Sequence, residues 1–326
     1  IFPSYSPVLG INSQQPPLRI LQDQLDGSNV YDNVQPSTYH ATSYNVQTSG
    51  VWDGVSNPIA PGSSIINIEK ELRIKAGVSV TFKNIMFQFA PGARLVIENG
   101  VSGGQGGKLL LDSTTLTNMP VCGKEDMWLG VEVWGNSTVA QGTVLNSSQG
   151  VLRMYNNSKI EHAYVGVLLS KRNTDQAGVV LLSSYDNNYN GGVAQVQNSE
   201  FLNCQYGMYF NTYTVGSNNL STISGSTFKW ENLFKKPSVK PQNHIHLFKT
   251  SAVTITASNF LQETPAVYGG IDQYGKGIYS NNSEFKVYSG CTNIFLPIGQ
   301  DCAESNTVRS QFKNLVYGVY VVNSKY

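Results

Sequence analysis

Three residues of the chain carry the functional groups that polysaccharide cleavage requires. A lyase uses carboxylates that hold Ca²⁺ together with an Arg or Lys base, and a glycosidase uses two carboxylates about 5 to 10 Å apart. Glu132, Glu161 and Arg153 lie in neighbouring β-rich segments, so they could meet if the chain coils back on itself. Asp and Glu are otherwise sparse and scattered, and isolated charged residues are most often solvated. The three residues are therefore weak candidates for a catalytic set and do not form a recognised motif.

Two histidines have the spacing of metal ligands on a strand. His244 and His246 alternate within HIHLF, so both rings would lie on one strand face, where imidazole nitrogens could bind a transition metal. Two ligands alone make a weak site, and the same segment is typical of an exposed strand face. We expect neither a bound metal nor another cofactor.

Several aromatic residues lie in or beside loops, where their rings could stack on sugars. Trp128, Trp230 and Tyr213 are the candidates for a ligand-binding groove, and Tyr206 and Tyr209 could extend it. The alternative is that these rings cover the core or fill T-shaped pairs inside it. Both interpretations stay open from the residues alone.

The four cysteines do not form a metal-binding pattern. Cys291 and Cys302 bracket ten residues and would close a loop by a disulfide in an oxidising compartment. Cys204 lies inside a repeat, where it would be a small buried apolar residue. The redox state of Cys122, which lies in a loop, stays open.

The segments that carry these residues alternate apolar and polar side chains over short stretches. From Ile65 onward, runs such as INIEKELRI, VSVTF and KLLLD follow one another, separated by turns rich in Gly, Asn and Ser. A period of two predicts strands with one face turned towards a core. The chain is therefore predicted to be all-β.

From Asn157 a repeat can be followed to the end of the chain. Its frame is Asn or Ser, then Ser, any residue, and Ile or Phe, and the apolar position recurs at intervals of about 25 to 41 residues. The Asn and Ser positions suit turns whose side chains bond the backbone of the same or the next coil. The apolar anchors are Ile160, Phe201, Phe228, Phe260, Phe285 and Phe312. These repeats predict a parallel β-helix, a solenoid of about nine or ten coils with the anchors stacked in its core.

Residues 1–60 differ from the rest of the chain, because they are interrupted by prolines and lack sustained alternation. We interpret them as an N-terminal cap, a linker or an arm that docks on a partner, since an open solenoid end exposes unpaired strand edges. Residues 61–326 are predicted to form the β-helix. Because the final run, GVYVVNSKY, ends inside a repeat, we expect the β-helix to be part of a longer chain.

The composition argues against two classes of partner. The formal net charge is +1, from 22 basic and 21 acidic residues, and no Lys/Arg cluster follows any segment. Nucleic acid is therefore not an expected partner. No apolar run approaches the roughly 18 residues that span a bilayer, so membrane insertion is not expected either. Charged residues make up only 13%, and polar uncharged residues replace them, which is common in secreted proteins.

At WLGVEVWGNSTVAQG and NNSKIEHAYVGVLL, the chain resembles the right-handed parallel β-helix regions of large secreted proteins of Bacteroidota. PGARLVIENG and GGKLLLDSTTLTN are similar to the lead-in of such regions, and the resemblance covers about residues 50–326. Many such proteins resemble cargo of the type IX secretion route, and members are generally described as cell-surface or released, often as adhesive. The resemblance implies a right-handed helix and a secreted location, and it carries over no catalytic residues.

These observations favour a non-catalytic secreted or cell-surface protein with a structural or adhesive role, including that of a subunit in an extracellular fibre. Its partners would be further copies of itself, other cell-surface proteins or an extracellular glycan. The alternative hypothesis is a polysaccharide lyase or hydrolase, or a glycan-binding module, that acts on an extracellular polysaccharide.

Overall fold

The computed structural model describes residues 39–40, 43–101, 103–120, 126–216, 219–231, 234–263, 275–291 and 303–326. Regular structure in these ranges is almost entirely β-strand, with short 3₁₀ helices at η2 (Asn187–Tyr189) and η5 (Glu304–Asn306). No helix of the described ranges is long and apolar enough to cross a membrane.

Three long parallel sheets contain most of the strands in the described residues. The strands of sheet A are, in order, β1 (Tyr39–His40), β4 (Ile65–Ile68), β7 (Met86–Phe89), β10 (Thr115–Asn118), β13 (Lys159–Glu161), β18 (Glu200–Leu202), β21 (Thr227–Trp230), β24 (Asn259–Gln262) and β29 (Gln311–Lys313). Those of sheet B are β2 (Ser43–Val46), β5 (Glu71–Ile74), β8 (Arg94–Ile97), β11 (Trp128–Val133), β14 (Ala163–Leu169), β19 (Tyr206–Phe210), β22 (Asn243–Phe248), β25 (Lys276–Asn281) and β30 (Tyr317–Val322). Those of sheet C are β3 (Gly50–Trp52), β6 (Ser79–Lys83), β9 (Lys108–Asp112), β12 (Val151–Tyr155), β17 (Val193–Gln197), β20 (Thr222–Ser224), β23 (Val253–Thr256) and β26 (Phe285–Tyr288).

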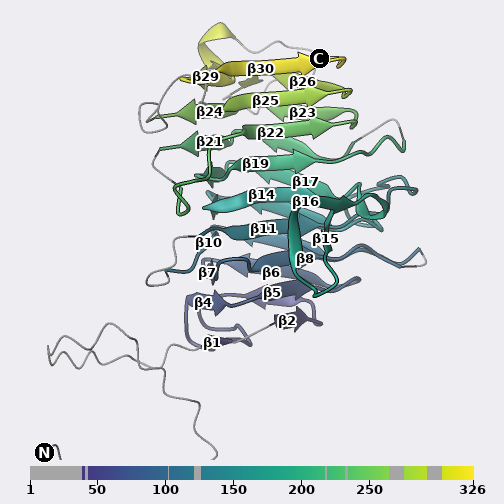
Figure 1. The fold of residues 1–326 in the computed structure, drawn as a ribbon, viewed down its shortest axis with the longest axis vertical. Coiled ribbons are helices and arrows are strands. Elements are labelled where there is room, and N and C mark those ends of the chain that lie inside the picture. Colours follow the sequence, from purple (N-terminus) through teal and green to yellow (C-terminus); the bar gives the residue numbers. More distant parts are fainter. Residues whose placement is uncertain are drawn as a thin grey trace, which may run out of the picture. The chain divides into compact units, whose positions relative to one another are not determined.

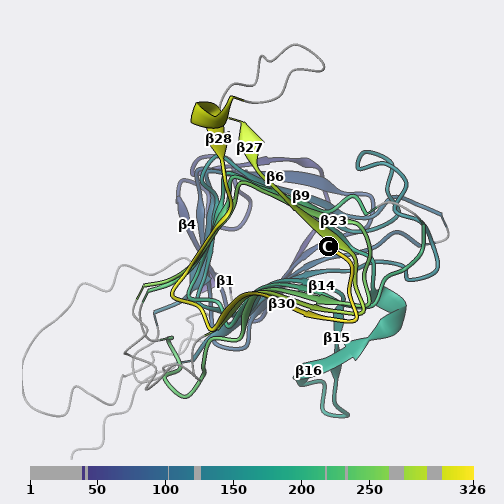
Figure 2. The same cartoon turned by 90° about the horizontal axis from the view of Figure 1, so that it is seen from above.

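Two antiparallel hairpins interrupt the cycle of the three sheets. One consists of β15 (Lys171–Thr174) and β16 (Val180–Asp186), and the other of β27 (Gly290–Cys291) and β28 (Thr307–Val308). Hairpin β15–β16 follows β14 and projects outward from sheet B, as the view from above shows (Figure 2). It is the larger of the two hairpins, and its residues line one side of a cavity on sheet B.

Successive strands enter sheets A, B and C in turn, and we call one such set of three strands a passage of the chain. Each strand pairs with the corresponding strands of the preceding and the following passage. Figure 1 shows these passages stacked from β2 to β30, and Figure 2 shows the three sheets around a central space that side chains fill. The all-β, parallel organisation predicted from the alternation is confirmed, and it is consistent with a parallel β-helix.

A column of stacked aromatic rings occupies the inner face of sheet A. Phe201, Phe228, Phe260 and Phe312 are register partners on β18, β21, β24 and β29. Consecutive ring centroids along this column lie 4.6, 5.2 and 4.8 Å apart. Ile160 on β13 pairs with Phe201 and continues the column. The predicted ladder of apolar anchors is confirmed for these five residues.

The prediction that Phe285 belongs to the same ladder is wrong. Phe285 lies on β26 of sheet C, where it pairs with Val253 and is buried. The Asn/Ser–Ser–x–Phe frame occurs at more than one corner of the chain's path, because the same turn chemistry suits each corner. The frame therefore predicts that a strand follows but does not identify the sheet that the strand joins.

Serine hydroxyls connect consecutive passages at the corner before sheet A. The hydroxyl of Ser226 accepts a hydrogen bond from the backbone N–H of Ser199 at 3.2 Å, and the hydroxyl of Ser258 accepts one from the N–H of Ser226 at 3.4 Å. The same hydroxyls donate to the carbonyls of Ser224 and Thr256 at 2.9 Å. The prediction that turn hydroxyls bond the backbone of their own coil is confirmed here, whereas the neighbouring coil that they bond is the preceding one and not the next.

Parallel stacking begins before the predicted boundary at residue 61. Strands β1, β2 and β3, which lie between Tyr39 and Trp52, pair with β4, β5 and β6. Residues 1–38 lie outside the described residues, so their role as a cap, linker or docking arm stays a prediction.

Candidate functional site

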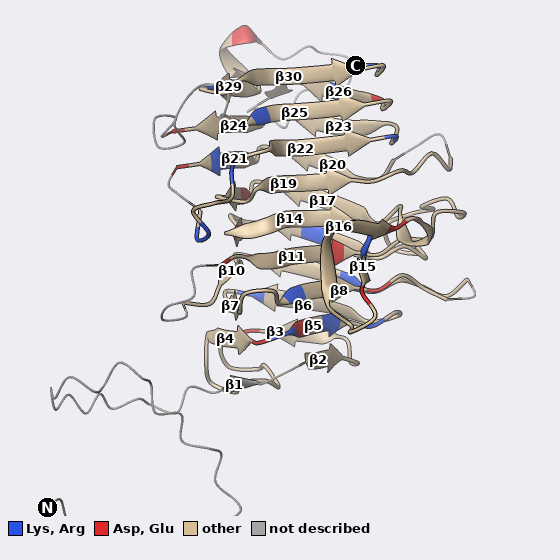
Figure 3. Cartoon of the chain, in the orientation of Figure 1, with Lys and Arg blue, Asp and Glu red and all other residues tan. Residues whose placement is uncertain are grey.

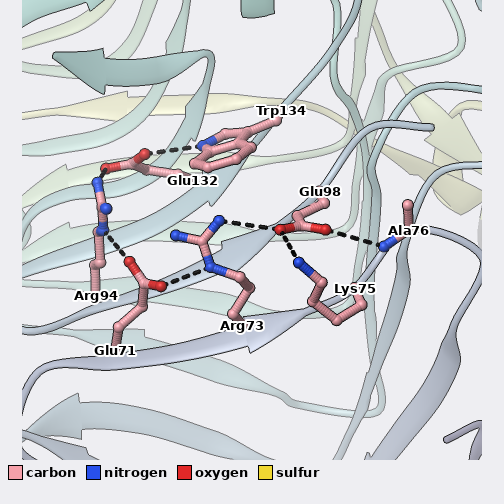
Figure 4. Close-up of polar contacts among 8 residues, drawn as sticks. All are labelled: Glu71, Arg73, Lys75, Ala76, Arg94, Glu98, Glu132 and Trp134. Carbon is pink, nitrogen blue, oxygen red and sulfur yellow. Dashed lines mark hydrogen bonds and ion pairs between the residues drawn. The ribbon is translucent and has the colours of Figure 1, made fainter. Parts of the chain in front are cut away.

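Charged side chains of alternating sign run along the outer face of sheet B and onto hairpin β15–β16. Figure 3 marks acidic and basic positions on the ribbon of β5, β8 and β11 in red and blue. Consecutive members are joined by N–O distances of 2.6 to 3.1 Å. In order, the series consists of Lys75, Glu98, Arg73, Glu71, Arg94, Glu132 and Arg172. We call it the charge ladder. Figure 4 shows all of its members except Arg172.

Glu132 is the sixth member of the charge ladder, and its side chain is fully buried. Its Oε1 accepts hydrogen bonds from Arg94 Nη1 and Arg172 Nη1, both at 3.1 Å, and its Oε2 accepts one from Trp134 Nε1 at 3.0 Å. The guanidinium of Arg172 is also fully buried, and its Nη2 donates to the carbonyl of Leu129 at 2.9 Å. Because Arg172 is on β15, this pair fastens the hairpin to the sheet beneath it.

Arginine and lysine neighbours keep the other two carboxylates of the ladder ionised. Burial alone would raise the pKa of Glu71, but hydrogen bonds and charges from Arg73 and Arg94 outweigh it and lower the pKa below its ordinary 4.5. At Glu98, Lys75 and Arg73 likewise outweigh burial and lower the pKa. Such carboxylates do not suit the role of general acid, which needs a raised pKa.

The three candidate catalytic residues lie on three different sheets. Glu132 is on β11 of sheet B, Glu161 on β13 of sheet A and Arg153 on β12 of sheet C. Glu161 forms an ion pair with Lys159 at 3.4 Å, and Arg153 is exposed and lines a separate, mostly polar cavity of about 400 Å³ on sheet C. Since outward side chains of different sheets point in different directions, the structure does not bring these residues together.

The three aromatic candidates for sugar stacking are buried instead. Trp128 and Trp230 have no exposed surface, and Tyr213 is 5% exposed. The Trp128 ring stacks on Phe89 with centroids 4.3 Å apart, and the Trp230 ring stacks on His244 at 3.6 Å. The Tyr213 hydroxyl donates to the carbonyl of Val139 at 2.8 Å. The prediction of a ligand groove at these residues is corrected, because no ring face is open to a sugar.

His244 and His246 do not share a strand face as predicted. The His244 ring is buried against Trp230, and burial lowers its pKa to about 3. The His246 ring lies on the outer side of β22, stacked on Tyr209 at 4.2 Å. Its Nδ1 is 3.0 Å from Nδ2 of Asn243, three residues earlier, so simple alternation fails along this strand. No group of three or more metal-ligating side chains occurs in the described part of the chain.

The cysteines agree with the sequence interpretation where they are described. Cys204 is free and buried, and burial raises its pKa to about 12. Cys291 on β27 is disulfide-bonded. Cys302 and Cys122 lie outside the described residues, so the pairing of Cys291 with Cys302 stays a prediction.

A cavity of about 460 Å³ lies between the outer face of sheet B, hairpin β15–β16 and the segment that precedes β22. Tyr206 and Tyr209 on β19 form its floor, Leu182 and Tyr185 on β16 form one wall, and Lys236 and Val239 form another. We call this cavity the tyrosine pocket. It is assembled by two insertions on one rigid sheet face, which is where binding sites commonly form.

The rings of the tyrosine pocket contact one another and continue into a longer aromatic series. Tyr209 lies 5.3 Å from Tyr185 and 5.6 Å from Tyr206 between ring centroids. Beyond Tyr209, the series continues through His246 to Tyr279 at 4.8 Å. The outer face of sheet B is therefore aromatic from the pocket to β25.

The only charged group that lines the tyrosine pocket among the described residues is already paired. Lys236 Nζ lies 3.2 Å from Asp126 Oδ2 and donates to the Tyr164 hydroxyl at 3.0 Å. The same hydroxyl donates to Asp126 Oδ1 at 2.8 Å. The pocket thus presents phenol, amide and hydroxyl groups without an uncompensated charge.

The sequence points to two residues of this pocket and does not reveal its walls. Tyr206 and Tyr209 were candidates because of their residue type, whereas Tyr185 and Lys236 come from insertions outside the repeat frame. The apolar run VVLL at residues 179–182, followed by polar residues, was the available signal for an extra hairpin.

In comparisons with known proteins, no protein-family model, no curated protein and no solved structure matches the chain.

Proposed function

We propose that the chain is a right-handed parallel β-helix of about nine or ten coils with a structural or adhesive, non-catalytic role outside the cell. The observation that carries this proposal is the register-matched column from Ile160 to Phe312. Consecutive members of this column pack on one another, so the coils that carry them are stabilised by their neighbours and this part of the stack is stiff. A stiff stack with an open lateral surface suits a spacer or an adhesive segment.

A location on the cell surface or in the secreted fraction is part of the same proposal. It is supported by the 13% share of charged residues and by the disulfide at Cys291, since disulfides persist in oxidising compartments. The resemblance to secreted β-helix proteins of Bacteroidota, and to type IX secretion cargo, points in the same direction. Partners would be other cell-surface proteins, further copies of the chain or an extracellular glycan.

A bead experiment tests the adhesive role and the absence of catalysis together. Beads that carry the whole chain are passed over surfaces coated with polysaccharides or with cell-surface proteins, and retention under flow is measured. In parallel, acidic and neutral polysaccharides are incubated with the chain and assayed for new reducing ends and unsaturated products. We expect retention on at least one surface and no shortening of any polysaccharide.

Two outcomes would overturn this proposal. Beads that are retained on no surface would contradict the adhesive role. Polysaccharide cleavage that disappears in a folded Glu161→Gln or Arg153→Ala variant would contradict the non-catalytic role. These two residues suit the test because neither is buried as deeply as Glu132, so their variants are expected to fold.

A glycan-binding module is the second candidate function, and the tyrosine pocket is the observation that favours it. Ligand pockets commonly range from about 300 to 1,000 Å³, and this cavity of about 460 Å³ lies in that range.

A further inference from the structure

The tyrosine pocket contains several hydrogen-bonding groups that the protein does not use. Among the described residues, the hydroxyls of Tyr185, Tyr206 and Tyr209 form no hydrogen bond to the protein, and neither do the side chains of Ser183 and Gln205. All five residues line one cavity. Partly buried phenol and amide groups without protein partners must bond water or a ligand, because leaving them unpaired is costly.

The same residues also provide flat apolar surfaces. Tyr206 and Tyr209 meet nearly edge to face, with an interplanar angle of 71°, so their rings form a corner and not a flat sheet. Leu182 and Val239 add aliphatic surface to the walls. A ligand that fits must offer apolar C–H faces and several hydroxyls close together, as a pyranose ring does.

The charge of the pocket selects among sugars. Lys236 is its only charged lining residue within the described part of the chain, and Asp126 neutralises it at 3.2 Å. Uronate or sulfated sugars would need an unpaired cation, so their desolvation would not be compensated. A neutral sugar matches the uncharged phenol, hydroxyl and amide groups.

The walls of the pocket are held in place before any ligand arrives. Hairpin β15–β16 is fastened by the fully buried pair of Arg172 and Glu132 at 3.1 Å, and Tyr185 is the register partner of Arg172. The Lys236 wall is fastened through Tyr164 on β14 at 3.0 Å. A pre-formed pocket binds with a smaller loss of conformational entropy.

We propose that the tyrosine pocket is a binding subsite for a neutral hexose or N-acetylhexosamine unit of an extracellular glycan. The proposal deepens the adhesive role described above, since it names the site and the chemical class that adhesion would use. The two proposals can fail separately. Loss of the sugar site leaves bead retention on protein surfaces intact, whereas failure of adhesion leaves affinity for a soluble sugar measurable.

The test is calorimetric titration of the whole chain with short neutral oligosaccharides of hexoses or N-acetylhexosamines (cello-, manno- and N-acetylchito-oligosaccharides) and with oligogalacturonate as the acidic comparison. We expect at least one neutral series to bind and oligogalacturonate not to bind. The triple variant Tyr185→Phe, Tyr206→Phe, Tyr209→Phe keeps the rings and removes the three hydroxyls. Its affinity should fall about 8-fold or more, because each of the three lost hydrogen bonds weakens binding by about 2- to 10-fold.

Tyr288→Phe is the matched control, because Tyr288 is 49% exposed on sheet C, away from the pocket. It should bind the sugar as the wild type does. The proposal is overturned if a folded chain binds none of the neutral sugars, or if the triple variant binds them as tightly as the control does. Tighter binding of oligogalacturonate that is lost in Lys236→Met would overturn the assignment of a neutral ligand.

Discussion

Arg172 on hairpin strand β15 donates from Nη1 to Oε1 of Glu132 on β11 at 3.1 Å, and neither side chain has any exposed surface. Forty residues separate the two in sequence. The pair therefore decides where an insertion lies on the sheet. A buried ion pair of this kind costs desolvation, so its main contribution is to specify one position for the hairpin.

The first prediction concerns the loss of charge at Glu132. Glu132→Gln should lower the free energy of unfolding by about 3 to 5 kcal/mol, because it leaves the buried guanidinium of Arg172 without a counter-ion. Arg172→Met should cost less, since Glu132 keeps Arg94 and Trp134 as partners. Urea unfolding followed by circular dichroism measures both. A loss at Glu132→Gln smaller than that of Arg172→Met would contradict this account of the pair.

The second prediction concerns the ring column of sheet A. Phe228 lies between Phe201 and Phe260, with ring centroids 4.6 and 5.2 Å away, and it has no exposed surface. Phe228→Ala should lower the free energy of unfolding by about 3 to 5 kcal/mol through the cavity that it creates. Leu145, which is 74% exposed, provides a control, and Leu145→Ala should change stability by no more than about 0.5 kcal/mol. Comparable losses in the two variants would argue that the column does not carry the stability of the stack.

The third prediction concerns a glycine at the entry to sheet B. A Cβ on Gly207 would lie 2.5 Å from the carbonyl oxygen of His244 and 2.6 Å from Cδ1 of Phe228. Gly207→Ala should therefore destabilise the fold by about 1 to 3 kcal/mol through overpacking. Gly50→Ala is the matched control, because nothing lies within 4 Å of its added Cβ. Thermal unfolding of the two variants tests the difference, and equal midpoints would show that the neighbouring coils yield without strain.

The fourth prediction concerns stability between pH 7 and pH 5. Burial lowers the pKa of His244 to about 3, whereas an unfolded histidine titrates near 6.5. The unfolded state then binds more protons, so the contribution of neutral His244 is complete above about pH 6.5 and is lost as the pH falls towards 3. At pH 5 the loss from this residue is about 2 kcal/mol. Glu71 and Glu98 act at lower pH, because their pKa values lie below 4.5.

Urea unfolding of the wild type and of His244→Phe at pH 7 and pH 5 measures this contribution. The drop in free energy between the two pH values should be about 2 kcal/mol smaller in the variant. His162 and His246, whose pKa values burial also lowers to about 4, should account for much of the drop that remains. An identical drop in the two proteins would mean that His244 is not a source of the acid sensitivity.

The strands and their inward faces could be predicted from sequence because both depend on local pattern. Alternation placed KLLLD on a strand, and Leu109 and Leu111 are buried on β9 as period two requires. The Phe positions of the repeat were predictable for the same reason. Phe285 was assigned to the wrong sheet, because the turn frame before it recurs at corners between different pairs of sheets.

The candidate sites were less predictable, because they depend on which outward side chains meet. Trp128 and Trp230 are adjacent to loops in sequence, yet the stack buries both rings completely. In the sequence Glu132 is an isolated acid, yet in the structure it accepts hydrogen bonds from Arg94 on β8, from Arg172 on β15 and from Trp134. The burial of Glu132 depends on where hairpin β15–β16 lies, and the repeat frame does not predict the position of that insertion.

The sequence by itself determined that the chain would form short strands with one apolar face, joined by turns of Asn, Ser and Gly. These properties follow from neighbouring residues, and parallel stacking follows from their repetition. Only the tertiary structure decided which strands share a sheet and where hairpin β15–β16 lies. It therefore also decided that Tyr185, Tyr206 and Tyr209 line one pocket. The physical reason is that the number of residues per coil varies with loop insertions. Contacts between outward side chains are therefore set by packing and ion pairing between residues that are distant in sequence.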